Sequence, residues 1–306
     1  MADAAATADR STETKRRLRA LVAFFRRHPW LRPLAVAGPP YAVLLLLFAL
    51  PVLTMLVISF RLGNIDGPFT LDNYAEFLAS ETYRSVLWQT LLITVKTTAV
   101  VTVVGYALAY SIVRFSRRTT LLLLLVILPF WTSYIIRMYA WINILQNEGV
   151  LDSTLTLLNL VDEPVGLLYT QDAVLIGFVY LWLPLAVLPF YASLSNMDPD
   201  LIEAAKDLGA GPIKAFFTVT LPTTANGVVT GIILVFIPTF GSFITPRLLG
   251  GTDNIMIGMV IENQFKSAFN WPFGAAIGIV ISAVVVALLI VGARSGGTMF
   301  ARGDER

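Results

Sequence analysis

The chain has 306 residues, of which 56% are hydrophobic and only 14% are charged, whereas charged residues make up about 25% of an average soluble domain. This composition excludes an ordinary soluble domain and favours a membrane protein, in which roughly 20 residues per spanning helix would give about six spans. The 22 basic and 20 acidic residues are too evenly balanced to indicate nucleic-acid binding, and with no cysteine and one histidine the chain has almost no sulfur or nitrogen ligands for a metal site.

Six apolar stretches follow one another along the chain. The first comes after a basic N-terminal arm over residues 1–33 and is too long for the apolar core of a signal peptide. Each stretch is long enough to cross roughly 30 Å of hydrocarbon. We therefore expect an all-α polytopic membrane protein with one membrane domain over residues 34–293 and spans at about residues 34–60, 86–113, 119–145, 173–194, 223–245 and 273–292.

The distribution of charge predicts the orientation of these spans. Basic residues gather in the arm, in the loop at residues 114–118, in the segment with Lys206 and Lys214, and in the tail over residues 294–306. The loop over residues 147–172 has five acidic residues and no basic one. Because basic loops stay in the cytoplasm, we expect both termini inside the cell. The arm is expected to attract anionic lipid, with a partner-docking helix as the alternative.

The segment over residues 197–222 lies between the fourth and fifth spans and has clear local signals. Asp198 and Pro199 predict the start of a short helix, because aspartate caps helices and proline suits the first helical position. Gly209 lies where a left-handed residue would end that helix. Gly211 and Pro212 then predict a second helix that leads into the fifth span.

The short helix of this segment has the features of a docking helix. Ala204 and Ala205 have almost no side chain, so a partner surface can approach the backbone closely. Glu203, Lys206 and Asp207 remain available for polar contacts at the rim of such a surface. A passive loop packed on the membrane face is the alternative that this pattern alone leaves open.

Glu203-Ala204-Ala205, Gly209, Phe216 and Leu221-Pro222 together resemble the EAA loop of ABC-importer permeases, the inner-membrane components of binding-protein-dependent transport systems. The resemblance implies the type I importer permease fold, in a bacterial or archaeal plasma membrane. It implies a second permease subunit, preferably a different chain, two ATP-binding subunits and an extracytoplasmic solute-binding protein. It also implies that the loop couples to the ATPase through Glu203, Ala204, Ala205, Asp207, Gly209 and Phe216.

Further matches extend this resemblance over roughly residues 41–290. The segments at residues 128–141, 183–194, 248–258 and 270–276 are similar to those of spermidine/putrescine permeases, most of all to the B-type subunit. The similarity implies a polyamine as the small-molecule solute. Many polyamine permeases have an acidic residue at the position of Ser242, so another amine-containing solute, such as an opine, a betaine-like compound or an amino-acid derivative, remains the alternative.

One candidate surface for the solute lies in the third span. Trp131, Tyr134, Met138 and Trp141 recur at the spacing of a single helical stripe. Aromatic faces attract a desolvated ammonium group, which makes Trp131, Tyr134 and Trp141 candidates for the solute pathway. Packing between helices is the alternative for such a stripe.

The end of the fifth span is a second candidate. Proline and glycine between residues 237 and 246 predict an interrupted helix, which a membrane tolerates only where protein or a cavity covers the backbone. Ser242 and Phe243 lie in this interruption and are therefore candidate gate residues on the solute pathway.

Several other residues of the spans need an explanation. Lys96 is expected about 15 Å deep in the second span, where it needs a partner such as Glu262 or a polar group of another subunit. Arg137 is expected to be an anchor that extends to the outer interface. The glycine pairs at residues 227 and 231 and at residues 274 and 278 predict close helix packing.

Motifs of catalysis are absent from the sequence. The chain has neither the G-x-x-x-x-G-K-[ST] loop that binds ATP nor the H-E-x-x-H pair of zinc enzymes. We expect a non-catalytic subunit that binds no cofactor and leaves ATP hydrolysis to a partner. An ion-coupled secondary transporter is a weaker alternative, because such carriers use intramembrane acidic residues and none lies between residues 82 and 147.

Overall fold

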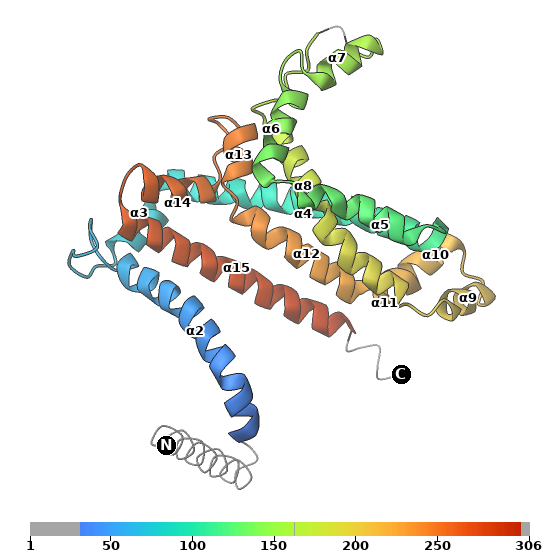
Figure 1. Ribbon diagram of the computed structural model, residues 1–306, viewed down its shortest axis with the longest axis horizontal. Helices are drawn as coiled ribbons and strands as arrows, with labels where there is room; N and C mark the ends of the chain where they lie inside the picture. The colour runs from blue at the N-terminus through green and yellow to red at the C-terminus, as the bar shows by residue number, and fades with distance from the viewer. Residues whose placement is uncertain (1–30, 162, 301–306) are drawn as a thin grey trace, which may run out of the picture. The chain divides into compact units, whose positions relative to one another are not determined.

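The computed structural model describes residues 31–161 and 163–300, and it folds them almost entirely into helices (Figure 1). The chain divides into two units, one up to Val57 and one from Ile58 onward, and each is described by itself. The basic arm expected over residues 1–33 lies outside the described residues except for its last three. The end of the tail expected over residues 294–306 also lies outside them.

The first unit consists of most of α2 (Leu31–Ser59), the helix expected at residues 34–60. Its first turn has no acidic residue and its last turn no basic one, and the residues from Pro40 to Ser59 are apolar enough to cross a membrane. A helix that is apolar on all faces suits a lipid environment rather than one side of a water-soluble core.

The second unit is centred on three helices that pack on one another: α4 (Glu81–Phe115), α8 (Gln171–Ser195) and α12 (Ala225–Phe240). α15 (Trp271–Phe300) lies against α12 (Figure 1). Close packing of α12 on α8 depends on glycine, because a Cβ atom added at Gly231 would come within 2.2 Å of the Phe190 ring. The predicted close approach at residues 227 and 231 is therefore confirmed.

The helix expected over residues 119–145 is interrupted, which corrects the expectation of one continuous helix. It consists of α5 (Thr119–Ile127), the 3-10 turn η1 (Leu128–Trp131) and α6 (Tyr134–Leu145). Pro129 cannot donate a backbone hydrogen bond, and Thr132 and Ser133 adopt extended backbone angles. The segment Thr119–Trp131 is bent by 95° from the segment Tyr134–Leu157, which begins with α6. We call residues 132 and 133 the α5–α6 bend.

A second bend lies after the polar segment at residues 197–222. There α10 (Pro212–Ala215), the π turn η2 (Phe216–Thr220) and α11 (Leu221–Thr223) form one arm, which is bent by 68° from α12. We call Thr224, the residue between them, the α11–α12 bend. α12 then ends at Phe240 and α13 (Ile244–Leu249) follows, so the interrupted helix predicted between residues 237 and 246 is confirmed.

Among the described residues, four helices are long and apolar enough to cross a membrane, or six if each bent pair is one span. These six correspond in sequence to the six expected stretches. The remaining helices are short: α3 (Asp72–Ala79), α7 (Val150–Leu157), α9 (Asp200–Asp207) and α14 (Ile257–Lys266). Figure 1 shows α7 and α9 beyond opposite ends of α8, so the acidic loop and the polar segment lie at opposite ends of that helix.

Candidate functional site

The polar segment at residues 197–222 begins with a capped helix, α9. The carboxylate of Asp198 accepts a hydrogen bond from the backbone N–H of Asp200 at 3.0 Å, and the Asp198 carbonyl accepts one from the N–H of Leu201 at 3.3 Å. Asp200 and Glu203 lie in the first turn, where negative charge is favoured by the helix dipole. Asp198 therefore caps the helix as predicted, from a position one residue before the assigned N-cap, Pro199.

The end of α9 has the geometry of a Schellman motif. The N–H of Gly209 donates to the Lys206 carbonyl at 2.8 Å, and the N–H of Ala210 donates to the Ala205 carbonyl at 3.0 Å. Gly209 has φ +82°, and no other atom lies within 4 Å of the place where a Cβ would be. The need for glycine is therefore conformational rather than steric, and the predicted left-handed ending is confirmed.

Most of the expected coupling residues face outward. None of the residues of α9 is buried, and the helix packs mainly against its sequence neighbours α10 and η2. Two apolar side chains beside it are also open, Leu208 at 89% exposure and Ile213 at 75%. An eight-residue helix with so little burial gains little stability from its own chain. The exposed members of the predicted set are Glu203, Ala204, Asp207 and Gly209, while Ala205 is half-buried.

Phe216 is the exception in this set, because it points into the protein. Its ring lies edge-on to two rings of α4, with centroids 5.9 Å from Tyr106 and 5.6 Å from Tyr110. Sequence reasoning missed both tyrosines, although their spacing of four residues places them on one face of α4. The segment therefore has an outer surface on α9 and an inner aromatic anchor on η2.

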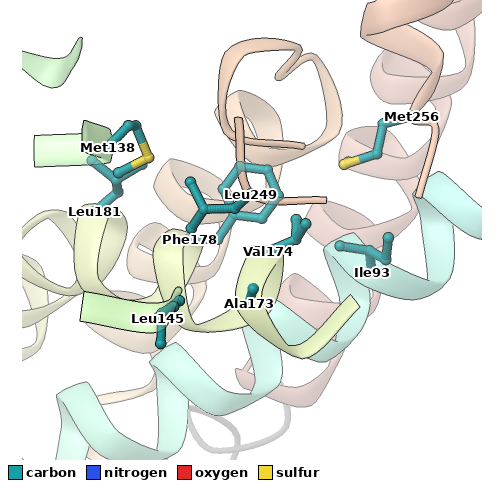
Figure 2. Close-up of a cluster of buried hydrophobic side chains, with 9 residues drawn as sticks. All are labelled: Ile93, Met138, Leu145, Ala173, Val174, Phe178, Leu181, Leu249 and Met256. Atoms are coloured by element: carbon teal, nitrogen blue, oxygen red, sulfur yellow. The ribbon is translucent and has the colours of Figure 1, made fainter. Parts of the chain in front are cut away.

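The aromatic stripe of the third span is divided by the α5–α6 bend. Trp131 lies before the bend and is 81% exposed, whereas Tyr134, Met138 and Trp141 lie after it on α6. Met138 is completely buried, and Figure 2 shows it in the same cluster as Phe178. Tyr134 and Trp141 pack against this cluster. Within the chain, α6 therefore uses these side chains for packing.

The interruption between α12 and α13 is covered by protein. The hydroxyl groups of Tyr134 and Thr245 lie 2.6 Å apart, which ties α6 to α13. A Cβ added at Gly258, on α14, would come within 2.6 Å of the Ser242 carbonyl oxygen. Ser242 and Phe243 are half-buried. The structure therefore brings Tyr134 to the region of these two residues.

The charged residues of the spans find different partners from those expected. Lys96 donates a 3.3 Å hydrogen bond to the side-chain oxygen of Gln171. Glu262, its expected partner, instead forms ion pairs with Arg247 at 2.7 Å and Lys266 at 3.0 Å. Within the described ranges, no three His, Asp or Glu side chains gather as metal ligands would.

Arg137 differs from the expected interfacial anchor, because only 8% of it is exposed. Its guanidinium carbon lies 5.5 Å from the centre of the Phe130 ring. Its Nε and Nη1 atoms are buried and have no hydrogen-bond partner among the described residues. Burying these two donors without acceptors is costly, so they are unsatisfied in the isolated subunit.

Comparison with known proteins identifies the family. Residues 102–295, more than half of the chain, match the family described as binding-protein-dependent transport system inner membrane component. The chain belongs to this family. It is a multi-pass inner-membrane permease of the ABC-importer type, which decides against an ion-coupled carrier.

The relatives and one solved structure agree with this assignment. The chain is 39% identical to the spermidine/putrescine transport system permease protein PotB of Escherichia coli K12, over 73% of this chain and 81% of the relative. It is 36% identical to PotB of Haemophilus influenzae, over 82% and 88%. A bacterial alginate ABC transporter in complex with a pentasaccharide-bound periplasmic protein has the same fold, with a TM-score of 0.75 at 16% identity over 90% of this chain and 98% of the matched chain.

Proposed function

We propose that this permease is one subunit of an ATP-driven importer of polyamines such as spermidine and putrescine. It forms half of a translocation pore with a second permease chain. Two ATP-binding subunits act on its cytoplasmic face, and a solute-binding protein delivers the solute from outside. The observation that carries the proposal is α9, a capped helix that is held by its own backbone turns yet exposes Glu203, Ala204, Asp207 and Gly209.

The geometry of this segment supports the proposed coupling role. The ATPase would hold the outer surface of α9 in a groove, where the small Ala204 side chain permits close approach. Because α9 continues through the short helix α10 and the π turn η2 into α11, a displacement of α9 is transmitted toward the α11–α12 bend. The permease supplies no ATP chemistry, and its work is mechanical.

The polyamine assignment is supported by the names of the relatives and by the aromatic side chains around the interrupted helices. Trp131, Tyr134 and Trp141 would present ring faces to an ammonium group, and Ser242 and Phe243 would line the gate. Glu262 is already engaged by two cationic side chains, so it is a poor partner for a cationic solute.

A solute that carries a carboxylate as well as an amine is a second candidate, and two observations on Ser242 and Arg137 favour it. Ser242 offers a hydroxyl group where a carboxylate would suit a dication. Arg137, on the same helix as Tyr134 and Trp141, has buried donors without acceptors. A solute that carries both an amine and a carboxylate, such as an opine or an amino-acid derivative, would satisfy such donors.

The test is ATP-driven uptake by the complete transporter in proteoliposomes. Labelled spermidine and putrescine are the probes, and betaine and an opine are the competitors. We expect saturable polyamine uptake that requires ATP and the solute-binding protein. Uptake of the opine with no uptake of polyamine would replace the first solute class by the second. ATP-dependent uptake that survives Glu203→Lys at full rate would contradict the coupling role of α9.

A further inference from the structure

The α11–α12 bend is held by α8. Thr224 is completely buried, and its hydroxyl donates to the Thr220 carbonyl at 2.7 Å. Its carbonyl accepts a hydrogen bond from the Ser193 hydroxyl of α8 at 3.2 Å. Gly227 lies so close to α8 that an added Cβ would come within 2.4 Å of the Ser193 Cβ. The bend is therefore a defined contact between helices and not a loose joint.

α4 holds the same residue from its own side. The Tyr106 hydroxyl lies 2.7 Å from the Thr224 hydroxyl oxygen. Because the single hydroxyl proton of Thr224 is directed to Thr220, Tyr106 is the donor in this pair. Both side chains are buried, so removing the Thr224 hydroxyl takes away the acceptor of a Tyr106 hydroxyl that lies away from water.

The same tyrosine also contacts Phe216, the first residue of η2, in the segment that links α9 to α12. The Phe216 ring stands edge-on to Tyr106 with an interplanar angle of 76°, and to Tyr110 with an angle of 88°. Tyr106 lies 5.8 Å from the Phe190 ring of α8 as well. α4 is therefore attached at two points to the segment that joins α9 to α12, at Phe216 and at Thr224.

The first attachment point, Phe216, begins the π turn η2 (Phe216–Thr220), and α11 then leads to the second, Thr224. A π turn contains one residue more than an α-helical turn, and such turns are frequent at functional sites. Conversion to a regular α-helical turn would rotate Phe216 by roughly 100° about the helix axis relative to Thr224. Because Tyr106 contacts both residues, α4 responds to any such change.

We infer that Tyr106 is a positioning residue for transport, which passes the movement of α9 to α4 as well as to α12 through its hydrogen bond to Thr224 and its contact with Phe216. The inference rests on the proposed function, since it takes α9 as the element that the ATPase moves. It assigns to α4 a share in coupling that the outward-facing residues of α9 do not reveal.

The chain offers a matched pair of variants for the test. Tyr106→Phe removes the hydroxyl that bonds Thr224 and keeps the ring against Phe216. Tyr110→Phe makes the same chemical change one helical turn away, at a hydroxyl for which no hydrogen bond is seen among the described residues. In proteoliposomes with the complete transporter, the ratio of spermidine imported to ATP hydrolysed is measured at equal amounts of assembled complex. We expect roughly a fivefold lower ratio for Tyr106→Phe and an unchanged ratio for Tyr110→Phe.

A second pair protects the test against a folding defect. Thr224→Val removes the acceptor of the Tyr106 hydroxyl, whereas Thr224→Ser retains it. We expect the ratio to fall for the valine variant and to be retained in the serine variant, and the double variant Tyr106→Phe with Thr224→Val should be no worse than Thr224→Val alone. A merely structural role would reduce the amount of complex without changing the ratio.

A distance measurement adds a readout within the permease. Because the natural chain has no cysteine, spin labels can be placed at Ser111→Cys on α4 and Leu208→Cys beside α9, both exposed positions. We expect the distance between the two labels to have the same narrow distribution in the nucleotide-free and the ATP-bound transporter. After Tyr106→Phe we expect this distribution to be broader.

The outcomes for Glu203→Lys and for the Tyr106 and Thr224 variants distinguish the coupling role of α9 from the positioning role of Tyr106. If Glu203→Lys abolishes uptake while Tyr106→Phe and Thr224→Val keep the wild-type ratio, the inference about Tyr106 is wrong and the proposed function stands. If Glu203→Lys leaves uptake intact, the proposed coupling role of α9 is wrong, and the inference falls with it.

Discussion

The two bends of the second unit differ in how far the rest of the chain covers their backbone. At the α11–α12 bend, Thr224 is buried and receives hydrogen bonds from Tyr106 of α4 and Ser193 of α8. At the α5–α6 bend, Thr132 and Ser133 are exposed beside the exposed Trp131. The irregular backbone of the α11–α12 bend is covered by the chain itself, whereas that of the α5–α6 bend is exposed.

This difference suggests different roles for the two bends: a contact with a neighbour for the α5–α6 bend and a link between helices for the α11–α12 bend. Irregular backbone at membrane depth is tolerated only where protein or a water-filled cavity covers it. The α5–α6 bend therefore fits the side of the subunit that meets the proposed second permease or the solute pathway. The buried donors of Arg137, four residues after Ser133, agree with a missing neighbour. The α11–α12 bend needs no further cover and is suited to transmit a displacement.

The largest effect is expected from breaking the packing of α12 on α8. Gly231→Leu would force a side chain into the Phe190 ring of α8 and should cost about 3 kcal/mol of stability, because overpacking cannot be relieved between two long helices. Thermal unfolding of the purified subunit in detergent measures it. Gly211→Leu, at a position with open space, is the control, and an equal loss there would contradict the packing explanation.

The next effect concerns the turn that ends α9. Gly209→Leu places a side chain at φ +82°, where the left-handed conformation costs roughly 1–2 kcal/mol. We expect the complex to assemble while ATP-driven uptake falls by roughly tenfold, because the outer surface of α9 loses its orientation. Gly211→Leu again serves as the control, since its φ of −65° suits any residue. Unchanged transport in an assembled Gly209→Leu protein would rule out the coupling role.

A smaller effect is expected at the open bend. Trp131→Ala removes a side chain that is 81% exposed, so the stability of the isolated subunit should change by less than about 0.5 kcal/mol. Polyamine uptake should fall severalfold if its ring contacts the solute, with Trp88→Ala, another exposed tryptophan, as the control. Full uptake by Trp131→Ala with normal ATPase coupling would remove this residue from the pathway.

The smallest effect distinguishes two arginines. Arg137→Met removes two buried donors that have no acceptor and should stabilise the isolated subunit by about 1 kcal/mol, yet weaken the assembled transporter. Arg247→Met breaks a partly exposed ion pair with Glu262. It should destabilise the isolated subunit and the assembled transporter alike, each by less than about 1 kcal/mol. Thermal unfolding of the subunit and of the complex gives the comparison. A loss of stability for Arg137→Met in the isolated subunit would show that its donors are satisfied there.

The positions of the spans and the turn at Gly209 were predictable because they depend on local properties. Hydrophobic length decides where a helix can cross a membrane, and a left-handed residue at a helix end selects glycine. The interruption before Pro246 was predictable for the same reason. The α5–α6 bend was not, because Pro129 alone is tolerated inside many membrane helices.

What the sequence by itself determined is therefore the six apolar stretches, the short helix α9 with its turn at Gly209 and, through family resemblance, the type of transporter. Tertiary structure alone decided which side chains face inward. The Tyr134–Thr245 and Tyr106–Thr224 contacts join residues 111 and 118 positions apart, and no local pattern encodes such pairs. Phe216 belongs to the same motif as Glu203, yet its ring packs on α4 instead of lying on the exposed surface of α9.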